Sequence, residues 1–425
     1  MGSITVTREV HPQEQDQSVN ASNSVNRILG QTYTSAKGVG MIECRHGAGG
    51  SATGGNEMWR SEDNGRSWSL QEVIPSRVEI GGGLNLLVSV SAFYLDCDHD
   101  LLVRFIVKEI VRDAAFGPWT TYDEMVGTHV PNTVRCFYQV SSDAGLSWTE
   151  ERQLIQKGSE YDEKHWAKDI TYEKSWLGVY APSLYPKLAD GTIVVSFYAG
   201  TGVEEDTFGT VQTGCLRARW TADVADIEWD MGGKVYGGGC EQTTALLNDG
   251  RILNIFRTQG LIEPYVFSEW LRPFSLSEDG GKTWTRPRPL GYTDGSSFTS
   301  PRAFSQLIRS AKNGKLYWIA NILPALDDPS SQFVERHPGR ATPRHPLQIA
   351  EVDEQNIAIK KETVTVIEDR EPGETHWVGF SNYRTYNDRE TGEIIVLMTK
   401  AYSELQENRM KLPHPHYRYR IALPD

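Results

Sequence analysis

The sequence predicts an all-β protein, a six-bladed β-propeller built from four-stranded antiparallel blades. Three observations lead to this prediction: an octapeptide that recurs three times, a series of apolar hairpins with Asp-Gly or Asn-Gly turns, and the lack of a competing helical period. Six blades of about 70 residues each would use the whole chain. We therefore expect a single domain over residues 1–425, with residues 1–24 as an extended N-terminal arm.

The recurring octapeptide keeps Ser, Asp, Gly and Trp at fixed places. It reads SEDNGRSW at 61–68, SSDAGLSW at 141–148 and SEDGGKTW at 277–284, and a degraded fourth copy runs from Thr221 to Trp229. The Asp can accept hydrogen bonds from the backbone of its own turn, the Gly supplies a positive φ, and the Trp is a large apolar anchor. Each copy is therefore expected to form a stapled hairpin turn after a strand.

The hairpins consist of an apolar strand, a short turn and a second apolar strand. Clear examples are SLYPKLADGTIVVSFY (183–198), TTALLNDGRILNIF (243–256) and QLIRSAKNGKLYWI (306–319), with looser members at 34–38 and 389–392. Asp-Gly and Asn-Gly between apolar runs are strong hairpin signals. In a propeller, the functional residues are expected at strand ends and in long loops, away from the octapeptide turns.

Composition excludes several classes of partner. The formal net charge is −13, whereas binding nucleic acid needs clustered excess Lys and Arg. No run approaches the roughly 18 apolar residues that span a bilayer. The opening residues lack the apolar segment of a signal peptide, so we expect a cytoplasmic protein as written, or a secreted one if a signal peptide has been removed.

Neither a cofactor nor a metal is predicted. The five cysteines are odd in number and lack C-x-x-C spacing, which indicates reduced, buried structural thiols rather than disulfides or a zinc site. The acidic run 94–100 holds three Asp and one His but does not complete a calcium-loop pattern. We interpret it as a solvated hairpin turn.

The octapeptide S-x-D-x-G-x-[ST]-W matches the Asp-box, or BNR repeat. With the order of the other motifs, the chain resembles the sialidase superfamily of six-bladed propellers over nearly its whole length. The resemblance implies a carbohydrate-active hydrolase, an exo-acting glycosidase that removes a terminal acidic sugar from an oligosaccharide or polysaccharide. It implies neither a membrane nor a nucleic acid as partner.

The resemblance also implies particular site residues. NRIL at 26–29 is similar to the sialidase strand that carries the first arginine of a triad, here Arg27, and the following ECR contributes Arg45. In CEQTTALLNDGRILNIFR, Glu241 falls on the glutamate that assists the nucleophile, and Arg257 on the second arginine.

The later motifs supply the third arginine and the nucleophile. RHPL resembles the stretch that brings the third arginine, here Arg344, and Arg302 after Ser-Pro is the alternative. SNYR resembles the segment with the tyrosine nucleophile, which implies Tyr383. The loop 46–57, where the family has an acid/base Asp, contains none. Its only titratable residues, His46 and Glu57, are therefore the acid/base candidates.

The chemistry of these residue types agrees with an acidic sugar. Arginines grip a carboxylate bidentately and stay charged. When that carboxylate is on the anomeric carbon, a neutral tyrosine avoids the repulsion that a carboxylate nucleophile would meet, and Glu241 could activate Tyr383.

Two other functions fit the same residues. A polysaccharide lyase acting on uronate glycans could use His46 and Tyr383 for proton transfer, with arginine stabilising the enediolate. A carbohydrate-binding propeller without turnover is the second alternative, and the missing Asp favours it.

Overall fold

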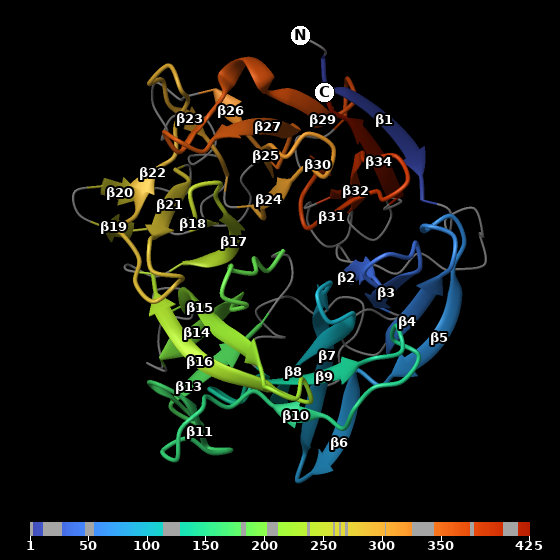
Figure 1. The fold of residues 1–425 in the computed structure, drawn as a ribbon, viewed down its shortest axis with the longest axis vertical. Helices are drawn as coiled ribbons and strands as arrows, with labels where there is room; N and C mark the ends of the chain where they lie inside the picture. Colours follow the sequence, from blue (N-terminus) through green and yellow to red (C-terminus); the bar gives the residue numbers. More distant parts are fainter. Residues whose placement is uncertain are drawn as a thin grey trace. The chain divides into compact units, whose positions relative to one another are not determined.

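The structure, a computed structural model, describes residues 3–11, 28–46, 55–113, 128–179, 184–201, 211–235, 239–257, 260–262, 265–267, 271–301, 303–324, 344–374, 378–402 and 415–425. The chain divides into two compact units. Residues 1–15, 235–278 and 284–425 form the terminal unit, and residues 16–234 with 279–283 form the central unit. Each unit is built from three antiparallel sheets that follow one another in chain order (Figure 1).

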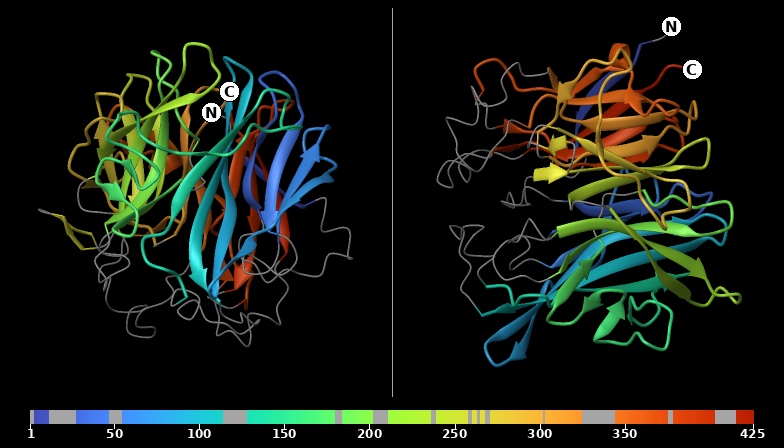
Figure 2. Two further views of the ribbon diagram at one scale, coloured as in Figure 1. Left: turned by 90° about the horizontal axis from the view of Figure 1, so that it is seen from below. Right: turned by 90° about the vertical axis from the view of Figure 1, so that its left-hand side faces the viewer.

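The central unit holds the first three sheets. The first sheet consists of β2 (Ile28–Tyr33), β3 (Met41–His46), β4 (Asn56–Ser61) and β5 (Ser69–Ile74). The second consists of β6 (Arg77–Gly81), β7 (Leu84–Asp96), β8 (Leu101–Arg112), β9 (Arg135–Ser141) and β10 (Arg152–Gln153). The third consists of β13 (Ser175–Gly178), β14 (Ile193–Thr201), β15 (Val211–Trp220) and β16 (Ile227–Lys234). Strands β7 and β8 pair along nearly their whole length and stand out as a long ribbon in Figure 2. A small pair, β11 (His165–Ala167) and β12 (Ile170–Thr171), lies outside these sheets.

The terminal unit holds the other three sheets. The fourth sheet consists of β17 (Cys240–Leu246), β18 (Ile252–Arg257), β21 (Pro273–Ser277) and β22 (Arg288–Pro289). The fifth consists of β24 (Gln306–Arg309), β25 (Leu316–Ala320), β27 (Leu347–Asp353), β28 (Ala358–Ile359) and β29 (Thr365–Glu368). The sixth consists of β1 (Thr5–Val10), β34 (His416–Ala422), β32 (Ile394–Thr399) and β31 (Arg384–Asn387). Three small pairs and one 3-10 turn complete it: β19 (Gly260–Ile262) with β20 (Tyr265–Phe267), β23 (Phe298–Thr299) with β26 (Leu323–Pro324), β30 (Val378–Gly379) with β33 (Ala401–Tyr402), and η2 (Lys361–Thr363).

These sheets confirm the all-β class and the six blades expected from the sequence. The hairpins at 243–256 and 306–319 are the strand pairs β17–β18 and β24–β25, and Gly250 and Gly314 have the positive φ that their turns require. Among the described residues no helix is long and apolar enough to cross a membrane.

The first described residues correct one expectation. Residues 5–10, expected within an extended arm, form β1, which pairs with β34 from Thr5↔Ala422 to Val10↔Tyr417. The reason is visible in Thr5-Val6-Thr7, because β-branched residues favour a strand whenever a sheet edge is available. The last blade is thus completed by the start of the chain, and residues 12–24 of the expected arm lie outside the described residues.

The octapeptide turns have the predicted bonding. In the first copy, Asp63 Oδ1 accepts the N–H of Ser67 at 2.8 Å, and Asp63 Oδ2 accepts the Ser67 hydroxyl at 2.6 Å. The second copy repeats this around Asp143, where the Ser147 hydroxyl and N–H, with Ser141, lower the pKa of the carboxyl to about 2. The sequence did not reveal that the residue before the Gly also has a positive φ, which is 60° at Ala144.

Ala144 provides a test of this turn. The left-handed conformation costs an L-residue about 1–2 kcal/mol, and a Gly at this position would remove that strain. The greater conformational entropy of Gly in the unfolded chain offsets about half of this gain in stability. We therefore expect Ala144→Gly to raise the free energy of unfolding by about 0.5–1 kcal/mol in urea titrations. The matched control is Gly145→Ala, which has φ 83° and a Cβ position 3.2 Å from Leu102, and which should destabilise. Unchanged midpoints for both variants would contradict strain at this turn.

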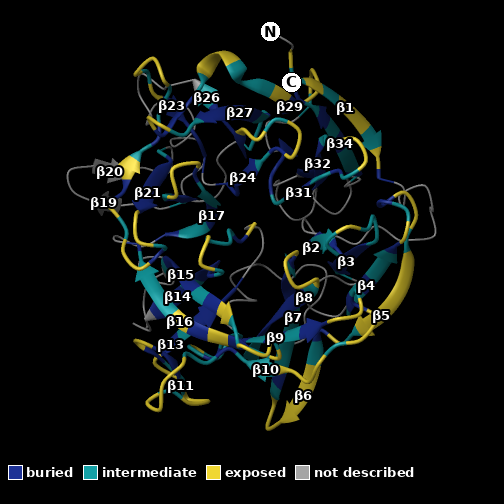
Figure 3. Ribbon diagram, in the orientation of Figure 1, coloured by how far each residue is buried: buried dark blue, intermediate teal, exposed yellow. Residues whose placement is uncertain are grey.

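Burial follows the strand order within the blades. Strand β3 is almost wholly buried, whereas β5 and β6 are exposed along most of their length (Figure 3). In the terminal unit, one core cluster packs Phe304, Tyr317, Phe380 and Tyr383 together. The candidate nucleophile therefore belongs to a hydrophobic core.

Two interpretations of polar residues need correction. The acidic run does form the β7–β8 turn, but Asp96 is fully buried, because it accepts hydrogen bonds from Lys187 Nζ at 2.7 Å and from His99 at 2.9 Å. All five cysteines are free, but the prediction that they are buried is wrong for Cys97 in that turn, which is exposed, and for Cys240, which is partly exposed. Turn position, rather than residue type, decides the exposure of Cys97.

Candidate functional site

Glu241 and Arg257 form an ion pair at the open end of the β17–β18 hairpin. Arg257 Nη1 donates to Glu241 Oε2 at 2.9 Å, and the two side chains are 13% and 28% exposed. In the ladder Cys240 is opposite Arg257, and a register shift between Cys240 and Thr243 leaves a bulge that begins at Glu241, one residue farther along β17. Bulges commonly redirect a side chain beside a functional site.

The backbone at Glu241 is strained as well as bulged. Its φ is +48°, a conformation that costs a non-glycine residue about 1–2 kcal/mol. Such residues persist only where the surrounding structure imposes them, and they concentrate at functional sites. The structure thus brings together the two residues that the sequence predicted as assisting glutamate and second arginine.

Arg272 is a further cation, on which Glu241 and Arg257 act electrostatically, and sequence reasoning missed it. It precedes β21, is 2% exposed, and places Nη2 within hydrogen-bond distance of Ser300 Oγ and of the carbonyls of Pro301 and Ala303. Burial lowers the pKa of its guanidinium to about 10, and the charge of Glu241 opposes that shift. The only sequence signal was an Arg-Pro step directly before the short strand β21, PFSLS.

Tyr383 lies in the core with no exposed surface. Its hydroxyl donates to the carbonyl of Ile319 at 2.6 Å, and its ring packs edge-on against Phe304 at 5.0 Å. Burial raises the pKa of Tyr383 well above its ordinary value, and the charge of Arg272 opposes this rise.

Tyr383 and Glu241, predicted as nucleophile and assisting glutamate, have other hydrogen-bond partners in the described residues. The Tyr383 hydroxyl is taken by a main-chain carbonyl, and Glu241 accepts from Arg257 instead. The role of Tyr383 as nucleophile stays a prediction, and it requires the hydroxyl to leave Ile319 and become accessible.

Arg344 contacts the segment 379–381, which directly precedes Tyr383 in the chain. It bridges Gly379 of β30, its carbonyl accepts the N–H of Phe380 at 2.8 Å, and its Nη1 donates to Ser381 Oγ at 3.1 Å. The other two predicted carboxylate ligands, Arg27 and Arg302, lie outside the described residues.

The remaining predicted residues belong to the central unit. His46 ends β3 opposite Asn56, and Glu57 on β4 accepts the indole N–H of Trp59 at 3.0 Å. Their role as acid/base is untested, and residues 47–54 between them lie outside the described part of the chain.

Arg45 is buried rather than poised for a ligand. It is 3% exposed, forms an ion pair with the fully buried Glu43, and lies over the rings of Trp59 and Trp68 at 4.9 and 5.4 Å. These contacts support a structural role, and its predicted role in substrate binding finds no support among them. Among the described residues, no group of three or more His, Cys, Asp or Glu is arranged to hold a metal.

Comparisons with known proteins agree on the fold. No family model and no curated protein matches the chain. Among solved structures, a protein of unknown function from Dyadobacter fermentans matches with a TM-score of 0.59 at 13% identity, over 100% of both chains. An intramolecular trans-sialidase from Ruminococcus gnavus, solved with oseltamivir carboxylate, matches with a TM-score of 0.58 at 11% identity, over 94% of this chain and 96% of its own.

A third similar structure is a sialidase from Trypanosoma rangeli solved with sialic acid. It matches with a TM-score of 0.55 at 14% identity, over 99% of this chain, which spans 57% of that sialidase's length. Identities this low carry information about fold only. Together with the six antiparallel sheets, they make the chain a six-bladed β-propeller with the fold of the sialidases.

Proposed function

We propose that the protein is a sialidase-like glycosidase that removes a terminal acidic sugar from a glycan. The observation that carries the proposal is the Glu241–Arg257 ion pair, held by a bulge and a strained backbone at the end of a hairpin. A stability function would not require this strain, whereas a site that must present a fixed carboxylate and guanidinium does. The sialidase-like fold supports the same class of reaction.

In this proposal the arginines bind the sugar, and Glu241 takes part in the hydrolysis. Arg257 and Arg344 bind the sugar carboxylate through paired N–H donors, which are oriented on the protein side by Glu241 and Ser381. Glu241 assists Tyr383 as the nucleophile once the tyrosine hydroxyl has left Ile319. The assignment of acid/base to His46 or Glu57 rests on the sequence alone.

The burial of Tyr383 favours a second candidate, a carbohydrate-binding propeller without turnover. A fully buried hydroxyl that donates to a main-chain carbonyl cannot attack a glycosidic carbon. If this is the working state of the protein, the arginines would bind an acidic sugar and release it unchanged.

A panel of glycans tests the proposal. The protein is incubated with sialylated, uronate-capped and rhamnose-capped oligosaccharides, while released sugars are followed by mass and unsaturation by ultraviolet absorbance. We expect release of an intact acidic sugar. Tyr383→Phe should abolish it while lowering the free energy of unfolding by only about 1 kcal/mol, the usual contribution of one hydrogen bond. Tyr317→Phe, another buried tyrosine of the same core, is the control and should remain active.

The other outcomes separate the alternatives. A product lighter by one water, which absorbs in the ultraviolet, would assign the protein to the lyases. Binding of an acidic glycan without any product would support the carbohydrate-binding propeller. An active Tyr383→Phe would overturn the nucleophile assignment and leave Tyr383 as a core residue.

A further inference from the structure

The Arg272 guanidinium is only partly satisfied by the protein. Its Nη2 has three acceptors in the segment 300–303, but Nε and Nη1 have no hydrogen-bond partner among the described residues. The side chain is almost completely buried. A buried donor without a partner costs about 1–3 kcal/mol, and more when it is charged, so a native protein seldom keeps one without a functional reason.

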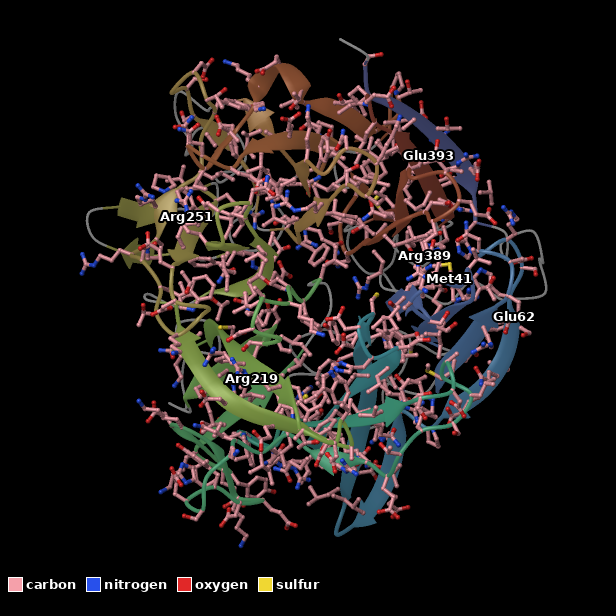
Figure 4. The ribbon with its side chains drawn as sticks, viewed as in Figure 1. Met41, Glu62, Arg219, Arg251, Arg389 and Glu393 are labelled. Carbon is pink, nitrogen blue, oxygen red and sulfur yellow. The ribbon has the colours of Figure 1, made fainter. Side chains whose placement is uncertain are left out.

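Arg272 is also a buried charge without an ion pair in the described part of the chain. Other arginines of the protein have carboxylate partners: Arg251 pairs with Asp249 at 2.7 Å, and Arg219 pairs with Asp190 (both arginines are labelled in Figure 4). Burying an uncompensated charge costs several kcal/mol. Its positive charge is therefore not explained by structural pairing.

Two charged residues of the candidate site act on Arg272 electrostatically. Glu241 favours the charged guanidinium, and Arg257 opposes it. With Arg257 and Arg272 protonated and Glu241 ionised, this cluster has two guanidinium groups for one carboxylate. In a chain whose net charge is −13, this is a local surplus of positive charge that an anionic ligand would neutralise.

We propose that Arg272 is a positioning residue that gives the site its preference for an anionic sugar. It acts in two ways: Nη2 binds Ser300 Oγ and the carbonyls of Pro301 and Ala303, and its fixed charge acts on the Glu241–Arg257 pair. The sugar part of this inference rests on the proposed function. The anion part rests only on the burial, the missing partners and the charge surplus.

The test compares Arg272→Met, which removes the charge, with Arg272→Lys, which keeps it but loses the planar fork. Affinities for glucuronic acid and N-acetylneuraminic acid, and for neutral galactose, are measured by calorimetry. We expect Arg272→Met to weaken binding of the acidic sugars at least tenfold, and Arg272→Lys to restore part of that loss, while any affinity for galactose changes little. Arg251→Met, which removes an arginine already paired with Asp249, is the matched control and should leave the ratio of acidic to neutral affinity unchanged.

A measurement without any sugar separates this inference from the proposed function. Sodium acetate should raise the melting temperature of the parent more than sodium chloride at equal ionic strength, and Arg272→Met should abolish the difference. If the parent binds no sugar but the acetate effect depends on Arg272, the glycan function fails and the anion role holds. If Arg272→Met keeps the parent's ratio of acidic-sugar to galactose affinity, Arg272 is structural and the inference is wrong. The same conclusion follows if Arg272→Met has a lower melting temperature and binds acidic and neutral sugars more weakly by the same factor. If the parent responds to neither acidic sugar nor acetate, both are wrong.

Discussion

Arg257→Met is expected to lower kcat/KM for acidic-sugar release by about 100-fold or more. Losing one partner of a largely buried, hydrogen-bonded charge pair costs about 2–5 kcal/mol, and about 1.4 kcal/mol corresponds to a factor of ten. The Arg257 side chain is 13% exposed, so water cannot readily replace its contact with Glu241. The substitution removes the guanidinium that binds the sugar carboxylate, and with it the partner that orients Glu241.

Arg257→Lys is the informative companion variant. Lysine keeps the charge but not the planar fork that pairs with a carboxylate through two parallel bonds. We expect Arg257→Lys to be roughly tenfold less active than the parent, between the parent and Arg257→Met. Steady-state kinetics with the substrate identified by the glycan panel measures both, and circular dichroism confirms that the variants are folded. An Arg257→Met protein with the parent's activity and a lower melting temperature would make the ion pair structural.

The sequence alone predicted the fold well because the fold depends on local, repeated signals. The turn at Asp63 and Gly65, and the hairpin around Gly250, need only residues that are close in the chain. The resemblance singled out Glu241 and Arg257 separately, and the structure pairs them because both lie on one hairpin. A bulge of one residue was enough to bring them together.

Features that depend on distant parts of the chain were not predictable. Tyr383 is buried because Phe304, just before β24, and Ile319 of β25 pack against it, and no local pattern distinguishes a core tyrosine from a nucleophile. Arg272 stands among apolar residues in the sequence, and its acceptors at 300–303 follow some thirty positions later. Asp96 appeared solvated because its partner Lys187 is supplied by another blade.

Arg45→Met is expected to lower the free energy of unfolding by about 3–5 kcal/mol, the usual cost of removing one member of a buried ion pair. Glu43 has no exposed surface and would lose the guanidinium that faces it. Methionine can still fill the space between Trp59 and Trp68, so most of the loss should come from charge rather than packing. Urea denaturation measures the effect. Arg219→Met is the control, because Arg219 and Asp190 are both about half exposed and such pairs contribute about 0–1 kcal/mol.

The double variant Glu43→Gln/Arg45→Met decides between a buried ion pair and a ligand residue. If charge is the cause, removing the stranded carboxylate should recover part of the stability lost in Arg45→Met, because buried ion pairs can be replaced by neutral groups at little cost. If Arg45 instead binds the sugar, as the resemblance to sialidases implies, Arg45→Met would melt close to the parent and lose affinity for acidic sugars. The burial of Arg45 and its two indole contacts make the first result the expected one, since a side chain already enclosed by a carboxylate and two rings has no face left for a substrate.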